Sequence, residues 1–200
     1  MTARASRKLT IADIADIRAY ERERVGFRQH IIDVKCRRRV SVGPHITFVF
    51  ENRDTVRFQI QEMARVEKLY SDEQIRTELR IYNPLIPEPG HLAATMFIEL
   101  TTDALLREWL PKLVHVERHV RLRIGGESVA FALDADHETQ LTRDDITSAV
   151  HYVHLALDES HIARFGDEPV ALVIDHAGYS FETVLEPGTI AELLGDLQED

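Results

Sequence analysis

The chain has 200 residues, of which 44% are hydrophobic and 29% are charged, and its formal net charge is −10. These values are typical of a globular domain that buries a core without needing a metal or a disulfide. No apolar run approaches the roughly 20 residues that cross a bilayer, the N-terminus lacks the apolar core of a signal peptide, and the single cysteine, Cys36, excludes an intrachain disulfide. We therefore expect a cytoplasmic protein with no membrane partner.

The charge is divided unevenly between the two ends of the chain. Residues 1–50 hold 11 Lys and Arg against 5 Asp and Glu, whereas residues 151–200 hold one, Arg164, against 11 Asp and Glu. A basic arm could bind nucleic acid or an anionic ligand. Alternatively, the two ends dock on each other, within one chain or across a homodimer. We favour docking and expect no nucleic-acid partner, because an acidic protein repels phosphate backbones.

The first 39 residues are predicted to be helical. Thr10 is a suitable N-cap for a first helix, and a second helix is expected over residues 20–36. The residues expected to face inward on the second helix are Val25, Ile32 and Cys36. Arg37–Arg39 follow near its C-terminus, where the helix dipole favours cations. Alternatively, Cys36 beside these arginines is a reactive nucleophile.

Residues 40–51 alternate in the way that a half-buried strand does. Ile46, Phe48 and Phe50 share one face, and Glu51 belongs to the other. Gly43-Pro44 predicts a bend or bulge before the strand proper, or an edge position. Asp54 is then expected to cap a helix whose inward residues are Val56, Ile60, Met63 and Val66.

Further along the chain, turn and capping signals are clear. Ser71 with Gln74 predicts a capping box for a helix that ends at Asn83-Pro84. "LAATMFIEL" is expected to be a strand, and Asp103 to cap a helix that ends or kinks at Pro111. The late segments "SAVHYVHLAL", "PVALVID" and "YSFETVL" are also expected to be strands.

The segment "HVRLRIGGESVAFAL" is the clearest local signal, because Gly125-Gly126 joins two alternating runs as a hairpin turn. The register that follows places two apolar pairs opposite each other on one buried face, Leu122 with Val129 and Val120 with Phe131. The residues expected on the other face are Arg121 and Arg123. The whole pattern predicts a single α+β domain over residues 1–200: N-terminal helices (1–39), then a mixed, largely antiparallel sheet with packed helices (40–200).

Ten histidines invite a metal-binding interpretation. His151, His154 and His91 are the candidate metal ligands. On a helix, His151 and His154 would share a face and could chelate one ion, whereas on a strand they would point to opposite faces. We favour the strand, so the three are not expected to form one chelate. The acidic stretch "DADHETQLTRDD" resembles a calcium-binding loop but lacks its central glycine, which favours a solvated loop.

The turn over Glu51–Asp54 is the candidate ligand site. It joins an apolar strand to the N-terminus of a helix, where an anion is favoured, and Arg53 is expected to point into the main concave site beside it. The other candidate ligand-binding residues are Glu51, Asn52, Gln59, Glu62 and His45. His45 shares a strand face with Glu51, but six strand residues, about 20 Å, separate them, too far for the two to act together. Alternatively, the segment is only a capped turn followed by a solvent-exposed polar face of the helix.

Four stretches of the sequence resemble the bacterial domain-of-unknown-function 3501 (DUF3501) family: "RRRVSVGPHITFVFENRDTVRFQIQEMARVE", "YNPLIPEPGHLAATMFIEL", "LPKLVHVERHVRLRI" and "TSAVHYVHLAL". Together they span nearly the whole chain. Members are similar to proteins encoded beside rubrerythrins and iron–sulfur oxidoreductases. The resemblance therefore implies an accessory role in peroxide or iron handling, with a rubrerythrin or an iron–sulfur oxidoreductase as partner.

Two functional hypotheses follow. The first is an accessory protein that binds iron or another divalent metal, haem or a protein partner through His and acidic residues. The second is a small enzyme that binds an anionic substrate at the Glu51–Asp54 turn, with Arg53 and a histidine. A scaffold without a small-molecule site is the third interpretation. The sequence leaves open whether the protein is an enzyme at all.

Overall fold

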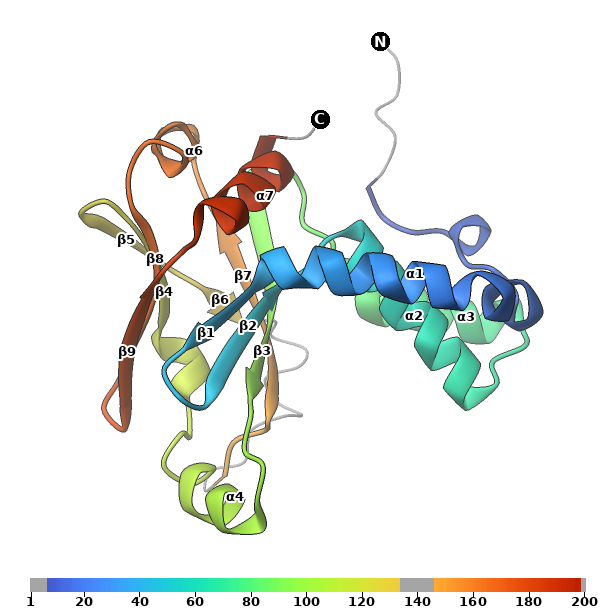
Figure 1. The fold of residues 1–200 in the computed structure, drawn as a ribbon, viewed down its shortest axis with the longest axis horizontal. Helices are drawn as coiled ribbons and strands as arrows, with labels where there is room; N and C mark the ends of the chain where they lie inside the picture. The colour runs from blue at the N-terminus through green and yellow to red at the C-terminus, as the bar shows by residue number, and fades with distance from the viewer. Residues whose placement is uncertain (1–6, 134–145, 199–200) are drawn as a thin grey trace.

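The computed structural model describes residues 7–133 and 146–198. The chain forms two antiparallel sheets, and a layer of helices projects from one side of them (Figure 1). The predicted α+β class is confirmed, although the strands make two sheets rather than one mixed sheet. The acidic stretch that resembles a calcium-binding loop lies outside the described residues.

The strands pair antiparallel throughout the described part of the chain. The first sheet contains, in spatial order, β1 (Arg39–Val42), β2 (Ile46–Phe50), β3 (His91–Ile98), β7 (Val150–Ala156) and β6 (Ala132–Leu133). The second contains β5 (Glu127–Ala130), β4 (Val120–Ile124), β8 (Val170–His176) and β9 (Tyr179–Val184). Shorter elements complete this half of the molecule: α4 (Asp103–Trp109), η3 (Val116–His119), α6 (Glu159–Phe165) and α7 (Pro187–Gln198).

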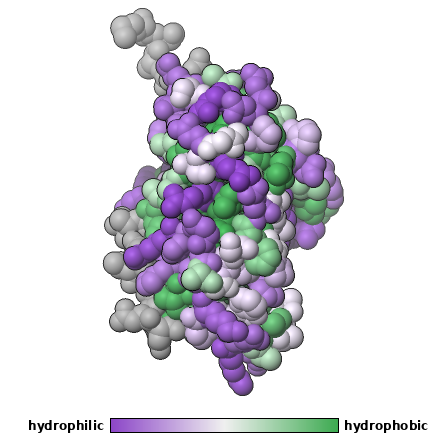
Figure 2. All heavy atoms as spheres, turned by 90° about the vertical axis from the view of Figure 1, so that its left-hand side faces the viewer, coloured by the Kyte–Doolittle hydropathy of each residue, from purple (hydrophilic) through white to green (hydrophobic). Residues whose placement is uncertain are grey.

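The main core lies between the two sheets. The alternation of β2 turns Ile46, Phe48 and Phe50 into this core, as predicted, where they are at most 1% exposed. Alternate residues of β4 and β8, such as Leu122 and Leu172, enter it from the second sheet. The molecular face that carries the second sheet is covered mainly by hydrophilic side chains, with apolar ones interspersed (Figure 2).

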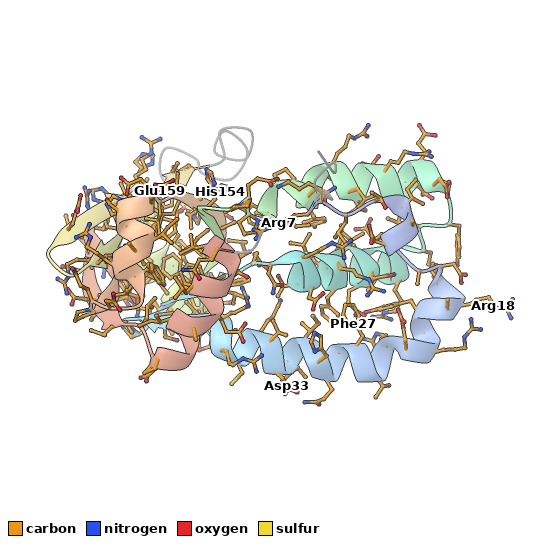
Figure 3. The ribbon with its side chains drawn as sticks, turned by 90° about the horizontal axis from the view of Figure 1, so that it is seen from above. Arg7, Arg18, Phe27, Asp33, His154 and Glu159 are labelled. Atoms are coloured by element: carbon orange, nitrogen blue, oxygen red, sulfur yellow. The ribbon has the colours of Figure 1, made fainter. Side chains whose placement is uncertain are left out.

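The helical layer has its own smaller core. It consists of η1 (Ile11–Asp13), α1 (Ile17–Arg38), α2 (Arg53–Glu67), α3 (Asp72–Tyr82) and η2 (Asn83–Leu85). Figure 3 shows α1 and α2 side by side, with Phe27 projecting from α1 toward α2, where its ring lies 5.7 Å from that of Phe58. The helices before β1 end at Arg38, and α2 and α3 are inserted between β2 and β3, so the helical layer is built from two separate parts of the chain.

Two predictions about the N-terminal helices, the cap at Thr10 and the inward face, are wrong for α1. Thr10 heads only the short η1, and α1 begins after Asp16, whose carboxylate accepts the Ala19 N–H at 2.9 Å. The predicted inward face is wrong, because Val25 is 81% exposed and Ile32 and Cys36 are also exposed. The buried residues of α1 are instead Tyr20, Ile31, Val34 and Arg38. A polar partner on each of Tyr20 and Arg38 makes their burial favourable.

The N-cap of helix α2 lies two residues earlier than predicted. Asn52, rather than Asp54, is the N-cap, and its side chain accepts the Thr55 N–H at 3.0 Å. Val56 and Ile60 are buried as predicted, whereas Val66 is 62% exposed. The capping box of α3 and the end of that helix at Asn83 are confirmed.

Gly43 belongs to a hairpin turn between β1 and β2 rather than to a bend within one strand. Its φ is +70°, and a Cβ there would lie 2.6 Å from the Tyr179 hydroxyl and from the Phe181 ring. The same hydroxyl donates to the Val42 carbonyl at 2.7 Å and accepts the His45 N–H at 2.9 Å. The turn is therefore fastened to β9 of the other sheet.

The β4–β5 hairpin has the predicted register. Leu122 pairs with Val129, and the Phe131 N–H donates to the Val120 carbonyl at 3.1 Å. Val120, Leu122 and Phe131 are buried, and Val129 is partly buried against the same core. The two arginines form ion pairs with neighbouring strands: Arg121 with Asp175 and Arg123 with Glu182.

The basic and acidic ends of the chain contact each other, as predicted, and they do so within one chain. Arg38 near the end of α1 is 3% exposed, and its guanidinium donates to Asp196 of α7 at 2.9 Å and to Glu192 at 3.1 Å. Arg37 adds a second pair with Glu192. No helix in the described ranges is long and apolar enough to cross a membrane.

Candidate functional site

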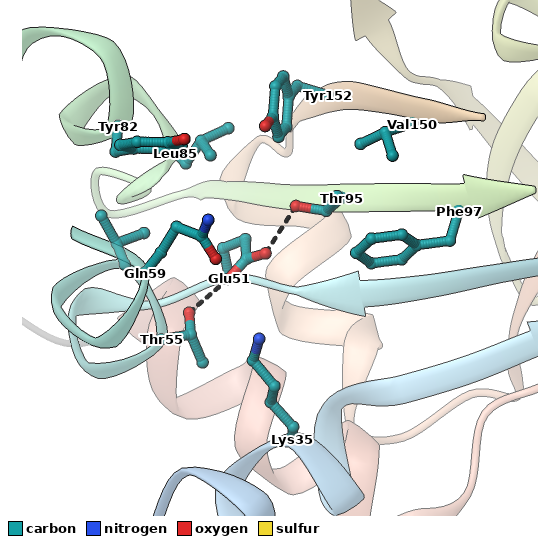
Figure 4. A pocket seen from close by; sticks show the side chains of 11 residues that line it. Lys35, Glu51, Thr55, Gln59, Tyr82, Leu85, Thr95, Phe97, Val150 and Tyr152 are labelled. Carbon is teal, nitrogen blue, oxygen red and sulfur yellow. Dashed lines mark hydrogen bonds between the residues drawn. The ribbon is translucent and has the colours of Figure 1, made fainter. Parts of the chain in front are cut away.

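A cavity of about 220 Å³ lies where the outer face of the first sheet meets the helical layer (Figure 4). Strands β2, β3 and β7 form its floor, and helices α1, α2 and α3 with η2 form its walls. The residues that line it are Lys35, Glu51, Thr55, Val56, Gln59, Tyr82, Leu85, Thr95, Phe97, Val150 and Tyr152.

Strand alternation decides which side chains reach this floor. The core face of β2 carries Phe48 and Phe50, so Glu51, the next residue, points to the opposite face. The antiparallel register then sets neighbours on that face: Thr95 of β3 lies opposite Tyr152 of β7. A carboxylate, a hydroxyl and a phenol are thus brought together by three strands.

Glu51 is the charged group at the floor of the cavity. Its side chain is buried, with 8% of the residue exposed. The Thr55 hydroxyl donates to Oε2 at 2.5 Å, and the Thr95 hydroxyl donates to Oε1 at 2.6 Å. A carboxylate has about four acceptor positions, so both oxygens can still accept a hydrogen bond from a ligand.

The cap of α2 positions one of these two donors. The Thr55 hydroxyl accepts the Asn52 N–H at 2.9 Å, which leaves its own proton for Glu51. Asn52 in turn accepts the Thr55 N–H. The helix start and the buried carboxylate are therefore one hydrogen-bonded unit, and Glu51 is held in a fixed orientation.

Lys35 enters the cavity from the last turn of α1. Figure 4 shows its side chain extending toward the cavity from one side, with Tyr82 and Tyr152 on the other side of Glu51. The side chain is partly buried, and its ammonium group forms no hydrogen bond or ion pair with any residue that the structure describes. The cavity thus carries one fixed negative charge and one positive charge without a protein partner.

Two phenols add hydrogen-bonding capacity. Burial raises the pKa of Tyr82, although a hydrogen bond with Gln59 opposes this shift. Burial also raises the pKa of Tyr152, and the nearby Tyr82 and Glu51 raise it further. Both phenols are therefore protonated at neutral pH. The rest of the lining is apolar and includes Phe97 and Val150.

Comparison with protein-family models matches residues 8–197 to the family described as "Protein of unknown function (DUF3501)". The chain belongs to the DUF3501 family. The family prediction from the sequence is confirmed. A crystal structure from Burkholderia pseudomallei, described as a novel protein of unknown function, is similar to this DUF3501 chain: the two are 34% identical, with a TM-score of 0.88 over 96% of this chain and 100% of that chain. A search of curated proteins found no match.

The structure separates the predicted ligand-binding residues of this DUF3501 chain. Glu51 and Gln59 line the cavity, and Asn52 caps the helix beside it. Arg53 does not point into the cavity, so that expectation is wrong. Its guanidinium pairs with Asp13 at 2.5 Å and lines a separate depression of about 80 Å³. Arg53, the first residue of α2, points away from the sheet, whereas Thr55, two positions later, points toward it.

Glu62 and His45 also lie away from the cavity. Glu62 accepts the Tyr20 hydroxyl and the Arg24 guanidinium, both at 2.7 Å, and Arg65 at 3.1 Å. These bonds, that of Arg24 foremost, lower the pKa of Glu62 to about 2 and join α1 to α2. His45 lies at the other end of β2, where its ring is 4.6 Å from that of Trp109.

The three histidines predicted as metal ligands do not converge. His151 and His154 both lie on β7 and point to opposite faces, as predicted. His151 is 4% exposed, its Nε2 lies 2.9 Å from the Ser148 carbonyl, and burial lowers its pKa. His91 is exposed, and it is a diagonal neighbour of His154 on the outer face of the sheet. Within residues 7–133 and 146–198, no group of three or more His, Cys, Asp or Glu side chains could hold a metal ion.

Sequence reasoning missed most of the cavity lining. Thr95 interrupts the apolar run of β3, and Tyr152 lies among the alternating residues of β7, so each could be recognised as a polar position on the outer face. Lys35 had no such signal, because its direction depends on how α1 packs on the sheet. The site prediction included Glu51, which lines the cavity, but took its companions from the same turn instead of from the neighbouring strands.

Proposed function

We propose that this DUF3501 protein binds a small organic molecule in the cavity, with a hydrogen-bond-donating group of that molecule, such as an amine, held by Glu51. The observation that carries the proposal is the buried Glu51 carboxylate, held by two threonine hydroxyls at the floor of a lined cavity. Such a carboxylate is aligned before any ligand arrives, which lowers the entropic cost of binding.

The size of the cavity limits the ligand. A cavity of about 150 Å³ holds a benzene molecule in other proteins, so about 220 Å³ suits a molecule somewhat larger than benzene. This is too small for haem or a dinucleotide. A metabolite with a short apolar portion fits the apolar lining around Phe97 and Val150.

The charge at the floor favours an amine over the anionic substrate predicted from the sequence. Glu51 would repel an anion that approached its free acceptor positions, and Arg53, which was expected to attract the anion, is engaged with Asp13 outside the cavity. A cationic or neutral donor gains a charge-assisted hydrogen bond from Glu51 instead.

An accessory role in peroxide or iron handling, with a rubrerythrin or an iron–sulfur oxidoreductase as partner, stays a prediction. So do an iron, other divalent metal or haem cofactor and a cytoplasmic location. They come from the family resemblance and the composition, and none of them is needed for a small molecule to bind in the cavity.

Isothermal titration with isoamylamine tests the proposal. We expect the wild type to bind isoamylamine and Glu51→Gln to bind it at least about tenfold more weakly, because the amide loses the charge-assisted bond. Glu99→Gln is the matched control, since Glu99 also accepts a threonine hydroxyl, that of Thr47 at 2.8 Å, but does not line the cavity. Equal binding by wild type and Glu51→Gln, or none by the wild type, would reject the proposal.

A further inference from the structure

We infer that the ligand is a small zwitterion of the amino-acid type, whose ammonium group is held by Glu51 and whose carboxylate is held by Lys35. This inference rests on the proposed function and adds the class of ligand. Glu51 by itself specifies only a donor group at one end of the molecule. The second end is specified by Lys35.

Lys35 is the cationic group of the cavity lining. Its ammonium group has no hydrogen-bond or ion-pair partner among the described residues, although many other basic side chains of this protein are paired. A ligand that fills the cavity displaces the water around this cation. A displaced hydration shell must be replaced by an acceptor, or binding is penalised. The ligand therefore carries an acceptor, and a carboxylate is the acceptor that best matches an ammonium group.

The two charges of the cavity lining are not paired with each other. Glu51 and Lys35 both line the cavity, yet they form no ion pair with each other. Figure 4 shows Lys35 approaching from α1, on one side of the Glu51 carboxylate. The carboxylate is fixed by Thr55 and Thr95, so it does not swing toward the lysine. A molecule with opposite charges at its two ends satisfies both groups at once.

Part of the remaining surface of the cavity is apolar. Val56, Leu85, Phe97 and Val150 provide apolar area that neither charge occupies. An aliphatic side chain on the ligand would be buried against these residues and gain hydrophobic energy. The cavity volume of about 220 Å³ accommodates an aliphatic amino acid but not a peptide. These features together describe a molecule of the size and polarity of leucine.

Three matched compounds test this inference by isothermal titration: leucine, isoamylamine, which lacks the carboxylate, and 4-methylpentanoate, which lacks the amine. We expect the wild type to bind leucine about tenfold more tightly than either of the others, the gain of one charge-assisted hydrogen bond. Lys35→Met should weaken leucine binding about tenfold, whereas isoamylamine binding should stay the same or become tighter, because the penalty for enclosing the lysine ammonium group is gone. Lys112→Met is the control, because Lys112 is an exposed lysine paired with Glu108.

Each outcome decides between the two proposals. If isoamylamine binds and leucine binds no more tightly, the zwitterion inference fails and the proposed function stands. If Lys35→Met binds leucine as the wild type does, the inference also fails. Tight binding of 4-methylpentanoate that survives Glu51→Gln would overturn both, as would the absence of any binding. Lys35→Gln repeats the test if Lys35→Met does not fold, which thermal melting would show.

Discussion

Arg38 and Arg53 each pair with an aspartate, but their surroundings differ. Arg38 is 3% exposed where α1 meets α7, and it donates to both Asp196 and Glu192. Arg53 is 43% exposed and pairs with Asp13 at the surface. Solvent screens the surface pair, whereas a buried partner left without its counter-charge is strongly destabilised.

The same substitution at these two positions should therefore give different losses of stability. We expect Arg38→Ala to lower the free energy of unfolding by about 3 kcal/mol, because it leaves the buried Asp196 carboxylate without its arginine and Glu192 with Arg37 alone. Arg53→Ala should cost less than about 1 kcal/mol. Urea unfolding monitored by circular dichroism measures both values. Equal losses would mean that the buried Arg38 pairs between α1 and α7 stabilise the protein no more than the surface pair of Arg53 does.

Glu62 makes the stability depend on pH. Its pKa is lowered from 4.5 to about 2, mainly by the hydrogen bond from Arg24, so the folded state favours the ionised form. A lowered pKa stabilises the protein fully above the unfolded value of about 4.5, and this contribution disappears as the pH falls toward 2. The contribution at neutral pH is at most about 3 kcal/mol, since Glu62 is partly solvated.

We expect Glu62→Gln to be less stable than the wild type at pH 7 and the difference to shrink steadily between about pH 4.5 and pH 2. Urea unfolding at pH 7, 5, 4 and 3 tests this. Glu108→Gln, which alters an exposed pair with Lys112, is the control and should show little difference at any pH. A wild-type advantage that stays constant down to pH 3 would mean that the Glu62 network does not favour the ionised carboxyl.

Some helices and strands could be predicted from local sequence signals, and others could not. The β4–β5 hairpin was predictable in register, because alternation and a two-glycine turn specify the same pairing. The capping box of α3 was predictable because its bonds are local. The inward face of α1 was not, since Val25 and Ile32 stay exposed while Tyr20 and Arg38 are buried. Burial there depends on partners, Glu62 and Asp196, that are far away in the sequence.

The two glycines of the β4–β5 turn are not equivalent. Only Gly125 has a positive φ, +55°, which is expected for a turn with glycine at its first central position. A Cβ on Gly125 would also lie 1.9 Å from a carboxylate oxygen of Glu168, whereas one on Gly126 would meet nothing within 4 Å. The backbone of the turn therefore requires glycine at one position and tolerates a side chain at the other.

Alanine at the two positions should separate these roles. We expect Gly125→Ala to lower the free energy of unfolding by about 1 kcal/mol or more, because alanine is strained at positive φ. Gly126→Ala should be neutral, or stabilising by up to about 1 kcal/mol, because it reduces the entropy of the unfolded chain. Chemical denaturation provides both values. If Gly126→Ala were the more damaging of the two, the assignment of the turn would be wrong.

At the scale of the whole molecule, the cavity is a consequence of chain order. Helices α2 and α3 leave the sheet after β2 and return at β3, so the outer face of the first sheet meets a helical layer with its own core. The polar side chains of Glu51, Thr95 and Tyr152 are enclosed at this junction (Figure 4). Sequence patterns identify the strand ends but not such an enclosure, which explains why Glu51 was selected while Lys35, Thr95 and Tyr152 were not.

The contact between the two ends of the chain also fixes α1, the helix that carries Lys35. Arg37 and Arg38 hold α1 against α7, and Lys35 lies one helical turn or less from both. The charge asymmetry between the two ends, which could have indicated nucleic-acid binding, is used here for packing within the chain. Because α1 is anchored in this way, the direction of Lys35 into the cavity is set by the fold.

The most direct test of the central claim is a crystal structure of this chain grown with isoamylamine. We predict electron density for the amine inside the cavity, with its nitrogen within about 3 Å of a Glu51 carboxylate oxygen. Density beside Arg53 in the smaller depression would contradict the claim, and so would density in a second, open depression that is lined by Leu79, Arg80 and Pro84. So would a cavity that contains only water at a concentration of amine that saturates binding in solution.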